Sequence, residues 1–372
     1  MYIYEYPEWP QFTWNNNDLI TLVASVKNAQ GKLIGKMSNL GFELINQANL
    51  EIMTQEVLKS SEIEGEFLDN SKVRSSICRR LGLEMPGTIT SDKNVDGIVD
   101  MMIDATHNFK SKLSKERLCG WHNSLFPNGF SGLYKISAGQ FRDDSKGPMQ
   151  VVSGGFGKEK VHYQAPNANL LNIEMDIFLN WFNTIQDIDL TVKSGIAHLW
   201  FVTLHPFDDG NGRIARALSD MLLTKSDNQI YRFYSMSSQI LKERKEYYEI
   251  LEKTQKGNLD ITNWLQWFLN CLLNALNSSE TILSKIIFKH NFWHKNAFKI
   301  ENERQSKIIN MLIDGFEGKL NTTKYAKICK CSQDTALRDI QCLISKNILV
   351  KLPGGGRSTS YELNLPENDI IR

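Results

Sequence analysis

The sequence predicts a mainly α-helical protein with little β structure and a small, separate domain near its C-terminal end. Over most of the first 280 residues, apolar side chains recur three or four positions apart, which is helical spacing. Residues 149–166 instead show two alternating segments around a glycine-rich turn, which indicates one β-hairpin, expected to be the only β feature in the middle of the chain. Beyond residue 300 the pattern changes to short helices followed by two strands.

The composition is that of a globular protein with two or three domains. The 372 residues are 41% hydrophobic and 23% charged, and the formal net charge is +1. This balance gives the whole chain no preference for nucleic acid or for a membrane surface. No run approaches the roughly 18 apolar residues of a membrane span. The opening MYIYEYPEWP lacks the basic and apolar run of a signal peptide. We therefore expect a cytoplasmic protein with no membrane partner.

Residues 1–85 are expected to form an N-terminal helical module. Residues 17–83 carry long amphipathic patterns, and Pro86-Gly87 then breaks them. The aromatic residues near the start, such as Phe12 and Trp14, are interpreted as packing anchors. Residues 86–280 form the next expected domain, the core. Its expected helices cover about 95–112, 114–125, 170–182, 190–204, 213–223, 243–256 and 261–278.

Residues 300–365 are expected to form a winged helix-turn-helix. Helices at about 304–313, 322–328 and 333–346 precede strands at 348–352 and 359–363, an order typical of that fold. The glycine-rich turn at 354–358 would be the wing. DNA and protein both remain open as partners of this domain, because the fold does not set the ligand. Its basic residues include Arg304, Lys307, Lys324, Lys327, Lys330, Arg338, Lys346, Lys351 and Arg357.

The strongest chemical signal lies between residues 205 and 216. A strongly apolar helix delivers a histidine to the loop HPFDDGNGR, and a second helix follows. Gly210-Asn211-Gly212 can turn successive backbone N–H groups toward one point, which makes an anion-binding nest at the start of a helix.

Charged side chains complete this nest. Arg213 and Arg216 add two guanidinium groups suited to phosphate oxygens. An acidic residue, Asp209, is unexpected in a loop that binds phosphate. Its presence is explained if the carboxylate holds a magnesium ion that bridges phosphates. His205 is a side chain that can accept a hydroxyl proton near neutral pH. These groups together indicate phosphoryl or nucleotidyl transfer; the alternative is a helix junction that they merely stabilise.

The segment resembles the signature of the Fic family, HPFx(D/E)GNGRxxR, at every defined position. The resemblance implies a helical-bundle core with a β-hairpin flap and protein adenylyltransferase activity. AMP would pass from ATP to a Tyr, Thr or Ser hydroxyl of a target protein or of the chain itself, and pyrophosphate would leave. It implies that His205 is the general base and that Asp209 binds Mg²⁺ through the nucleotide phosphates. The implied ATP-binding residues are Asp209, Gly210, Asn211, Gly212, Arg213, Ile214, Ala215, Arg216, Tyr247 and Gln255.

Two further segments resemble the family. Residues 149–166 resemble the flap that holds a target peptide by strand addition, and Gly139-Gln140-Phe141-Arg142 just before them is similar too. The stretch Arg244-x-x-Tyr247-Tyr248 resembles the lining of the adenosine pocket. An ordinary surface turn and core-packing tyrosines are the alternatives.

The sequence around residue 64 resembles an inhibitory motif of the family, (S/T)xxxE(G/N). Ser60, Glu64 and Gly65 occupy its defined positions. The resemblance implies that Glu64 pairs with Arg216 in the space of the ATP γ-phosphate and inhibits transfer. Glu64 as a solvated helix residue is the alternative, and the same glutamate can instead support removal of AMP.

Other functions remain open. The chain can be a DNA-binding regulator whose core senses a nucleotide, although sensing needs no base such as His205. It can also move UMP, phosphocholine or phosphate, which the Arg213 and Arg216 pair disfavours. The family resemblance further implies a homodimer.

Overall fold

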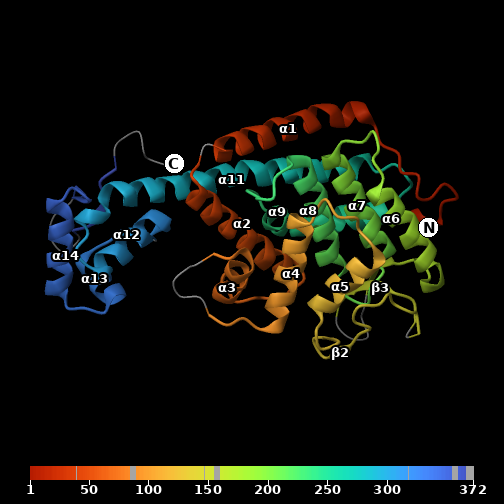
Figure 1. Cartoon of the computed structure of the whole chain (residues 1–372), viewed down its shortest axis with the longest axis horizontal. Coiled ribbons are helices and arrows are strands. Elements are labelled where there is room, and N and C mark those ends of the chain that lie inside the picture. The colour runs from red at the N-terminus through yellow and green to blue at the C-terminus, as the bar shows by residue number, and fades with distance from the viewer. Residues whose placement is uncertain are drawn as a thin grey trace. The chain divides into compact units, whose positions relative to one another are not determined.

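The computed structural model describes residues 1–38, 40–83, 89–145, 147–154, 160–316, 318–353 and 359–365. The chain divides into two compact units, Met1–Ser279 and Glu280–Arg372. The structure is mainly helical, as predicted (Figure 1). The helices that begin in the first unit are η1 (Ile3–Glu5), α1 (Asn16–Ser38), α2 (Phe42–Ile63), α3 (Asn70–Leu81), α4 (Lys93–His107), α5 (Lys115–Leu125), η2 (Ala168–Leu170), α6 (Leu171–Asn183), α7 (Leu190–Leu204), α8 (Asn211–Asp227), α9 (Met236–Lys242), α10 (Arg244–Gln255) and α11 (Thr262–Asn296).

Helices α7 and α8 form the centre of the first unit. They pack against each other, and α8 also packs against α2, α4 and α5 (Figure 1). Every residue of α7 from Thr191 to Leu204 is buried, as expected for a helix that is apolar on all sides. The loop between these two helices, residues 205–210, therefore extends from the most deeply buried part of the unit.

The β structure of the first unit consists of two antiparallel pairs. Strands β3 (Gln150–Ser153) and β4 (Lys160–Gln164) form the predicted hairpin. Its turn at 155–159 lies outside the described residues. Strands β1 (Phe130–Ser131) and β2 (Tyr134–Lys135) form a second pair. The expectation of a single β feature in this region was therefore wrong, since two-residue strands give no alternation to recognise.

The N-terminal segment packs onto the helical bundle. The rings of Trp9 and Phe12 meet Trp200 of α7 edge to face, with centroids 6.0 and 5.5 Å away. The backbone of Thr13 pairs with residues 259 and 261, at the start of α11. These contacts confirm Phe12 as a packing anchor, and Trp9 has the same role. Residues 84–88, where the boundary near Pro86 was expected, lie outside the described part of the chain.

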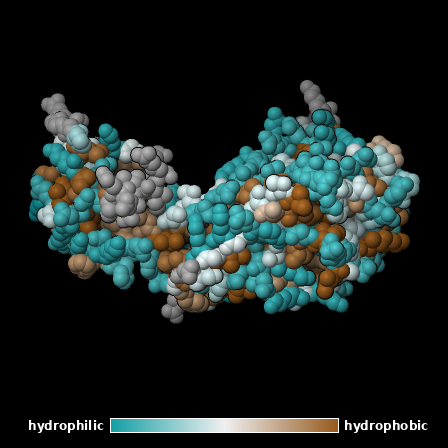
Figure 2. Space-filling model, turned by 90° about the horizontal axis from the view of Figure 1, so that it is seen from above, coloured by the Kyte–Doolittle hydropathy of each residue, from teal (hydrophilic) through white to brown (hydrophobic). Residues whose placement is uncertain are grey.

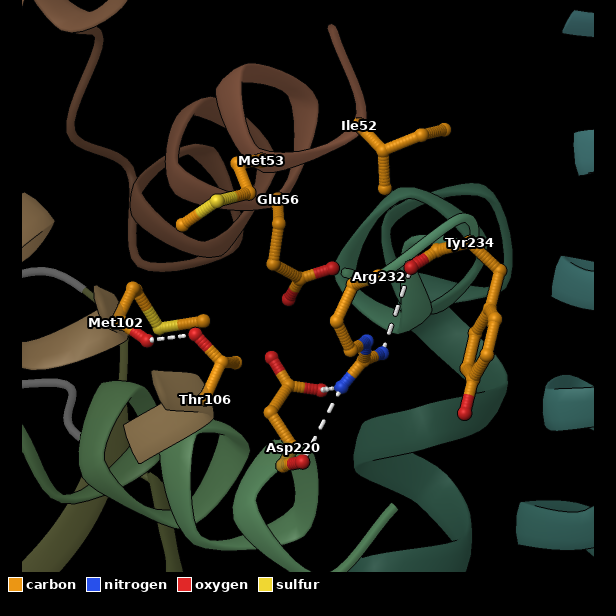
Figure 3. A pocket seen from close by; sticks show the side chains of 8 residues that line it. All are labelled: Ile52, Met53, Glu56, Met102, Thr106, Asp220, Arg232 and Tyr234. Atoms are coloured by element: carbon orange, nitrogen blue, oxygen red, sulfur yellow. Dashed lines mark hydrogen bonds and ion pairs between the residues drawn. The ribbon is translucent and has the colours of Figure 1, made fainter. Parts of the chain in front are cut away.

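Helix α2 is held in place by buried charge (Figure 3). The Glu56 carboxylate accepts hydrogen bonds from Ser235 Oγ at 2.6 Å and from Ser237 N at 3.1 Å, at the start of α9. Beside it, Asp220 of α8 pairs with Arg232, and both are almost fully buried. Burial raises the pKa of Asp220 to about 7 even though Arg232 opposes this. Because a buried carboxylate is costly unless it is hydrogen-bonded or paired, the Glu56 bonds fix α2 against the start of α9, and the Asp220 pair fixes α8 against the segment that carries Arg232.

Several helix boundaries differ from the sequence prediction. Helix α4 ends at His107 rather than near residue 112, α8 continues to Asp227, and α11 continues to Asn296. Helix α9 was not predicted, because seven residues are too few for a clear helical period.

The second unit contains the predicted order of short helices and strands. These are η3 (Ala297–Lys299), α12 (Glu303–Gly315), α13 (Thr322–Cys329), α14 (Gln333–Ser345), β5 (Leu349–Lys351) and β6 (Tyr361–Leu363). Lys330, at φ +50°, ends α13, and the Ser332 side chain caps α14, so a tight turn joins the two helices. Buried residues such as Ile308, Tyr325 and Ile340 form the core of this unit. The expected wing at 354–358 lies outside the described residues.

The protein surface is mostly hydrophilic on the face in view, with hydrophobic side chains in scattered groups (Figure 2). Among the helices of the described residues, none is long and apolar enough to cross a membrane.

Candidate active site

The loop between α7 and α8 has a defined backbone shape. His205 adopts a left-handed conformation at φ +49°, and Gly210 does so at φ +78°. The Asn211 side chain closes the loop, since its Oδ1 accepts from Phe207 N at 3.0 Å and its Nδ2 donates to Phe207 O at 2.8 Å. Gly210 has a second constraint, because a Cβ there would lie 2.9 Å from the Phe126 ring.

A buried arginine holds this loop from the other side. Arg142 Nε donates to the His205 carbonyl at 2.8 Å, and Arg142 Nη2 donates to the Pro166 carbonyl at 2.6 Å. Its backbone N–H donates to Pro206 O at 2.9 Å. Arg142 thereby joins the loop between α7 and α8 to the segment that follows the hairpin. The sequence resemblance included Arg142 but did not predict this role, because burial of an arginine leaves no local pattern.

His205 is oriented as a base. Its Nδ1 lies 3.3 Å from the carbonyl oxygen of Val202. A carbonyl only accepts, so Nδ1 carries the proton and Nε2 keeps its lone pair. Burial lowers the pKa of His205 to about 4, which keeps the imidazole neutral at physiological pH.

Both arginines of the loop are buried and contact carboxylates. Arg216 Nη2 lies 2.7 Å from Glu64 Oε1, and Ser60 accepts from the same guanidinium through Oγ at 2.9 Å and its carbonyl at 2.8 Å. Arg213 Nη1 lies 2.6 Å from Glu66 Oε2. The structure therefore contains the expected contact between Glu64 and Arg216. The contact of Glu66 with Arg213 was not predicted.

Glycines make these contacts geometrically feasible. Gly65 adopts φ +84° and reverses the chain after α2, so that the side chains on both of its sides reach the loop. A Cβ on Gly212 would lie 2.2 Å from Glu64 Oε1. Glu64 therefore lies directly over the backbone expected to bind phosphate.

Asp209 is a partly exposed acidic residue of the loop, with 42% of its side chain accessible. Its Oδ1 accepts from Gly210 N at 2.6 Å, and its Oδ2 accepts from Ser131 Oγ of β1. The described residues contain no cluster of three or more acidic, histidine or cysteine side chains that could hold a metal.

A pocket of about 490 Å³ opens beside the loop. It brings together three groups of residues: the loop with Glu64 beside it, the hairpin, and one face of α10. Its lining residues are Glu64, Val151, Val152, Ser153, His162, Tyr163, Val202, His205, Gly212, Arg244, Tyr247, Tyr248, Leu251, Glu252 and Gln255.

Tyr247 and Gln255 both line this pocket, and both are mostly buried. The Tyr247 hydroxyl lies 2.9 Å from His198 Nε2, and Gln255 Nε2 lies 3.4 Å from Val202 O. By contrast, the side chains of Ile214 and Ala215 are fully buried between the helices, which leaves only their backbone for contact with a ligand.

Residues 112–223 match the Fic/DOC family, so the chain contains a Fic/DOC domain over these residues. Residues 2–83 match a domain of unknown function, DUF4172. The chain is 25% identical over 237 residues to protein adenylyltransferase Fic of Drosophila grimshawi, a match covering 63% of this chain and 44% of that protein. It is 26% identical over 238 residues to protein adenylyltransferase Fic of Aedes aegypti, covering 63% and 43%. The chain thus spans less than half the length of these curated relatives.

The fold resembles a solved structure over nearly its whole length. The crystal structure of a Fic family protein from Desulfovibrio desulfuricans G20 matches with a TM-score of 0.53 and 18% identity. The match covers 95% of this chain and 98% of that one. This similarity supports the helical Fic-type fold.

Proposed function

We propose that the chain is a protein adenylyltransferase, which transfers AMP from ATP to a Tyr, Thr or Ser hydroxyl of a target protein and releases pyrophosphate. One observation carries the proposal: a neutral histidine whose Nε2 keeps its lone pair and two buried arginines of α8 lie within one glycine-rich segment, residues 205–216, beside a pocket. The names of the curated relatives support the same activity.

The chemistry follows from the loop. His205 Nε2 accepts the proton of the target hydroxyl, whose oxygen then attacks the α-phosphorus of ATP. The backbone of residues 210–212 and the N-terminal end of α8 stabilise the phosphate charge. Arg213 and Arg216 hold the outer phosphates, and the face of α10 with Tyr247 and Gln255 holds the adenosine. Rate enhancement then comes mainly from positioning and charge stabilisation.

A magnesium ion fits this site only together with the nucleotide. Asp209 supplies one exposed carboxylate, and Mg²⁺ commonly binds one or two carboxylates plus substrate phosphates. Such an ion would neutralise charge on the phosphates.

The same site carries its own inhibition. Glu64 and Glu66 occupy the guanidinium groups that ATP needs, and Glu64 lies over Gly212. A γ-phosphate directed at Arg216 would meet the Glu64 carboxylate, and like charges at contact distance repel. We therefore propose that the resting chain is inhibited by two acidic residues, of which Glu64 is the stronger.

The hairpin is the proposed docking site of the target. Strand β3 lines the pocket through Val151, Val152 and Ser153, so a target strand added to the hairpin would place its hydroxyl at the pocket.

The second unit is proposed to be a winged helix-turn-helix that contacts proteins. Several of its basic side chains are engaged inside the unit: Arg304 Nε lies 2.8 Å from Asp339, and Lys346 Nζ lies 2.7 Å from Glu301. These pairs reduce the charge available to DNA phosphates. Salt-dependent binding of the full chain to duplex DNA would contradict this proposal.

The test of the activity compares two labels. The chain with Glu64→Gly is incubated with magnesium and with ATP labelled at either the α- or the γ-phosphate, and protein-bound label is measured with intact mass. The α-label should enter protein and the γ-label should not. Addition of His205→Ala should abolish incorporation into an acceptor protein added to the reaction, while ATP still binds. Incorporation of the γ-label, or full transfer without His205, would contradict the proposal.

A further inference from the structure

Two side chains of the hairpin and one of α10 form a chain of hydrogen bonds that the proposed reaction does not use. Ser153 Oγ of β3 lies 2.6 Å from His162 Nε2 of β4. His162 Nδ1 lies 2.6 Å from Glu252 Oε2 of α10. All three residues line the pocket that contains His205. A hydroxyl, an imidazole and a carboxylate in this order form the arrangement that activates a serine nucleophile.

The direction of each hydrogen bond follows from chemistry. The Glu252 carboxylate can only accept, so His162 Nδ1 donates to it. In neutral His162 the lone pair is then on Nε2, and the Ser153 hydroxyl must donate to that lone pair. Glu252 stays ionised, because hydrogen bonds from Lys256 and then from His162 lower its pKa. The serine oxygen is thus polarised by a base that is itself oriented by a carboxylate.

A β-bulge places His162 in this position. Val151 pairs with Tyr163, but the next residue, Val152, pairs with Val161, so His162 is the extra residue of its strand. Alternation along a regular strand would direct adjacent side chains to opposite faces. Here both His162 and Tyr163 line the pocket. Tyr163 is anchored by its hydroxyl, which donates to Thr203 O at 2.7 Å.

We propose that Ser153 is an acceptor of AMP within the chain itself, with His162 as its base. The inference rests on the proposed function, since ATP in the shared pocket is the electrophile. Ser153 Oγ forms a bond to the α-phosphorus, the bond from that phosphorus to the bridging oxygen breaks, and pyrophosphate leaves. The hydroxyl proton passes to His162 Nε2, and Glu252 stabilises the resulting imidazolium.

Two consequences distinguish this reaction from general labelling. The reaction is intramolecular, so the fractional rate of labelling does not depend on protein concentration. Because the AMP attached to Ser153 stays on the pocket wall, it occupies the nucleotide site. Once Ser153 is labelled, the pocket can therefore no longer bind ATP for transfer to another hydroxyl.

The experiment uses the full chain with Glu64→Gly, ATP labelled at the α-phosphate, and magnesium. Peptide mass mapping locates the label, and its appearance at Ser153 is followed at several protein concentrations. Added Ser153→Ala should remove this label, whereas Ser153→Thr, which keeps a hydroxyl, should retain it. Added His162→Gln should slow Ser153 labelling by roughly 100-fold or more, the usual contribution of a general base. Added Glu252→Gln should slow it at least about tenfold, because the amide no longer selects the tautomer. The matched control is Glu246→Gln, an exposed carboxylate on the same helix, which should leave it unchanged.

The outcomes separate this inference from the proposed activity. Label found only on other residues, such as Ser131 beside Asp209, would refute Ser153 as acceptor and leave the adenylyltransferase proposal intact. Labelling of Ser153 at an undiminished rate in His162→Gln, or at a fractional rate that rises with protein concentration, would also refute it. A complete lack of incorporation, on this chain and on any added protein, would refute both.

Discussion

Replacement of Glu64 by glycine removes the carboxylate that occupies Arg216. Arg216 is only 1% exposed and Glu64 is 28% exposed, so their contact is largely shielded from water. A hydrogen bond to a charged group in such a setting contributes about 1.5–3 kcal/mol. If ATP must break this contact to bind productively, its removal should raise the rate of AMP transfer about 10- to 150-fold.

Glu66 should contribute less to the inhibition. Its side chain is 45% exposed, although Arg213 is only 4% exposed, so solvent screens the pair. Exposed pairs contribute about 0.2–1 kcal/mol, which predicts at most about a fivefold rise in Glu66→Ala. The double variant should be more active than Glu64→Gly alone.

The assay is the initial rate of α-phosphate label transfer at a fixed ATP concentration. The matched control is Glu62→Ala, because Glu62 lies in the same turn but pairs with Lys59 at 2.7 Å. Its rate should equal that of the unmodified chain. A larger activation by Glu66→Ala than by Glu64→Gly, or no effect of Glu64→Gly, would refute this mode of inhibition.

Four further predictions concern the loop and its supports. With a His205 pKa of about 4, the Glu64→Gly chain should transfer AMP at a nearly constant rate between pH 8 and about 5.5. A decline in this rate that starts at about pH 7 would contradict a base that is neutral at physiological pH. The lowered pKa of His205 should also make the free energy of unfolding fall as the pH falls from about 6.5 to 4, because the histidine of the unfolded chain binds a proton first. Urea unfolding at several pH values measures this fall, and the His205→Ala variant should lack the part that His205 causes. Arg142→Ala should lower the free energy of unfolding by about 3–5 kcal/mol, since it leaves buried carbonyls without a donor and Asp144 without its arginine partner; a loss below about 1 kcal/mol would contradict this role of Arg142. Glu56→Ala should cost about 3 kcal/mol and raise AMP transfer, because α2 then loses its bonds to α9; unchanged thermal unfolding would argue against this anchor.

Local patterns predicted the elements that are long or chemically distinctive. Helix α7 is recognisable because its apolar residues extend over 15 positions, and the loop after it because glycine, asparagine and arginine recur in a fixed order. The hairpin was visible through alternation. Helix α9 and the pair β1–β2 were missed, because two to seven residues are too few to show a period.

The functional residues divide in the same way. Ser60 and Glu64 belong to a motif that can be read along the chain. Glu66 has no such motif, and neither does Arg142, whose side-chain partners lie up to 63 residues away. Their roles depend on burial and on contacts between distant segments.

The sequence by itself determined the helical class, the loop from His205 to Arg216 and the chemistry that its side chains can perform, because these depend on residue type and local order. Only the tertiary structure decided which groups face that loop. It brought the end of α2 over Gly212, and it brought Glu252 of α10 to a histidine 90 residues earlier. Packing of distant helices sets such distances, and hydrogen bonds and ion pairs weaken so steeply with distance that only the folded chain reveals them.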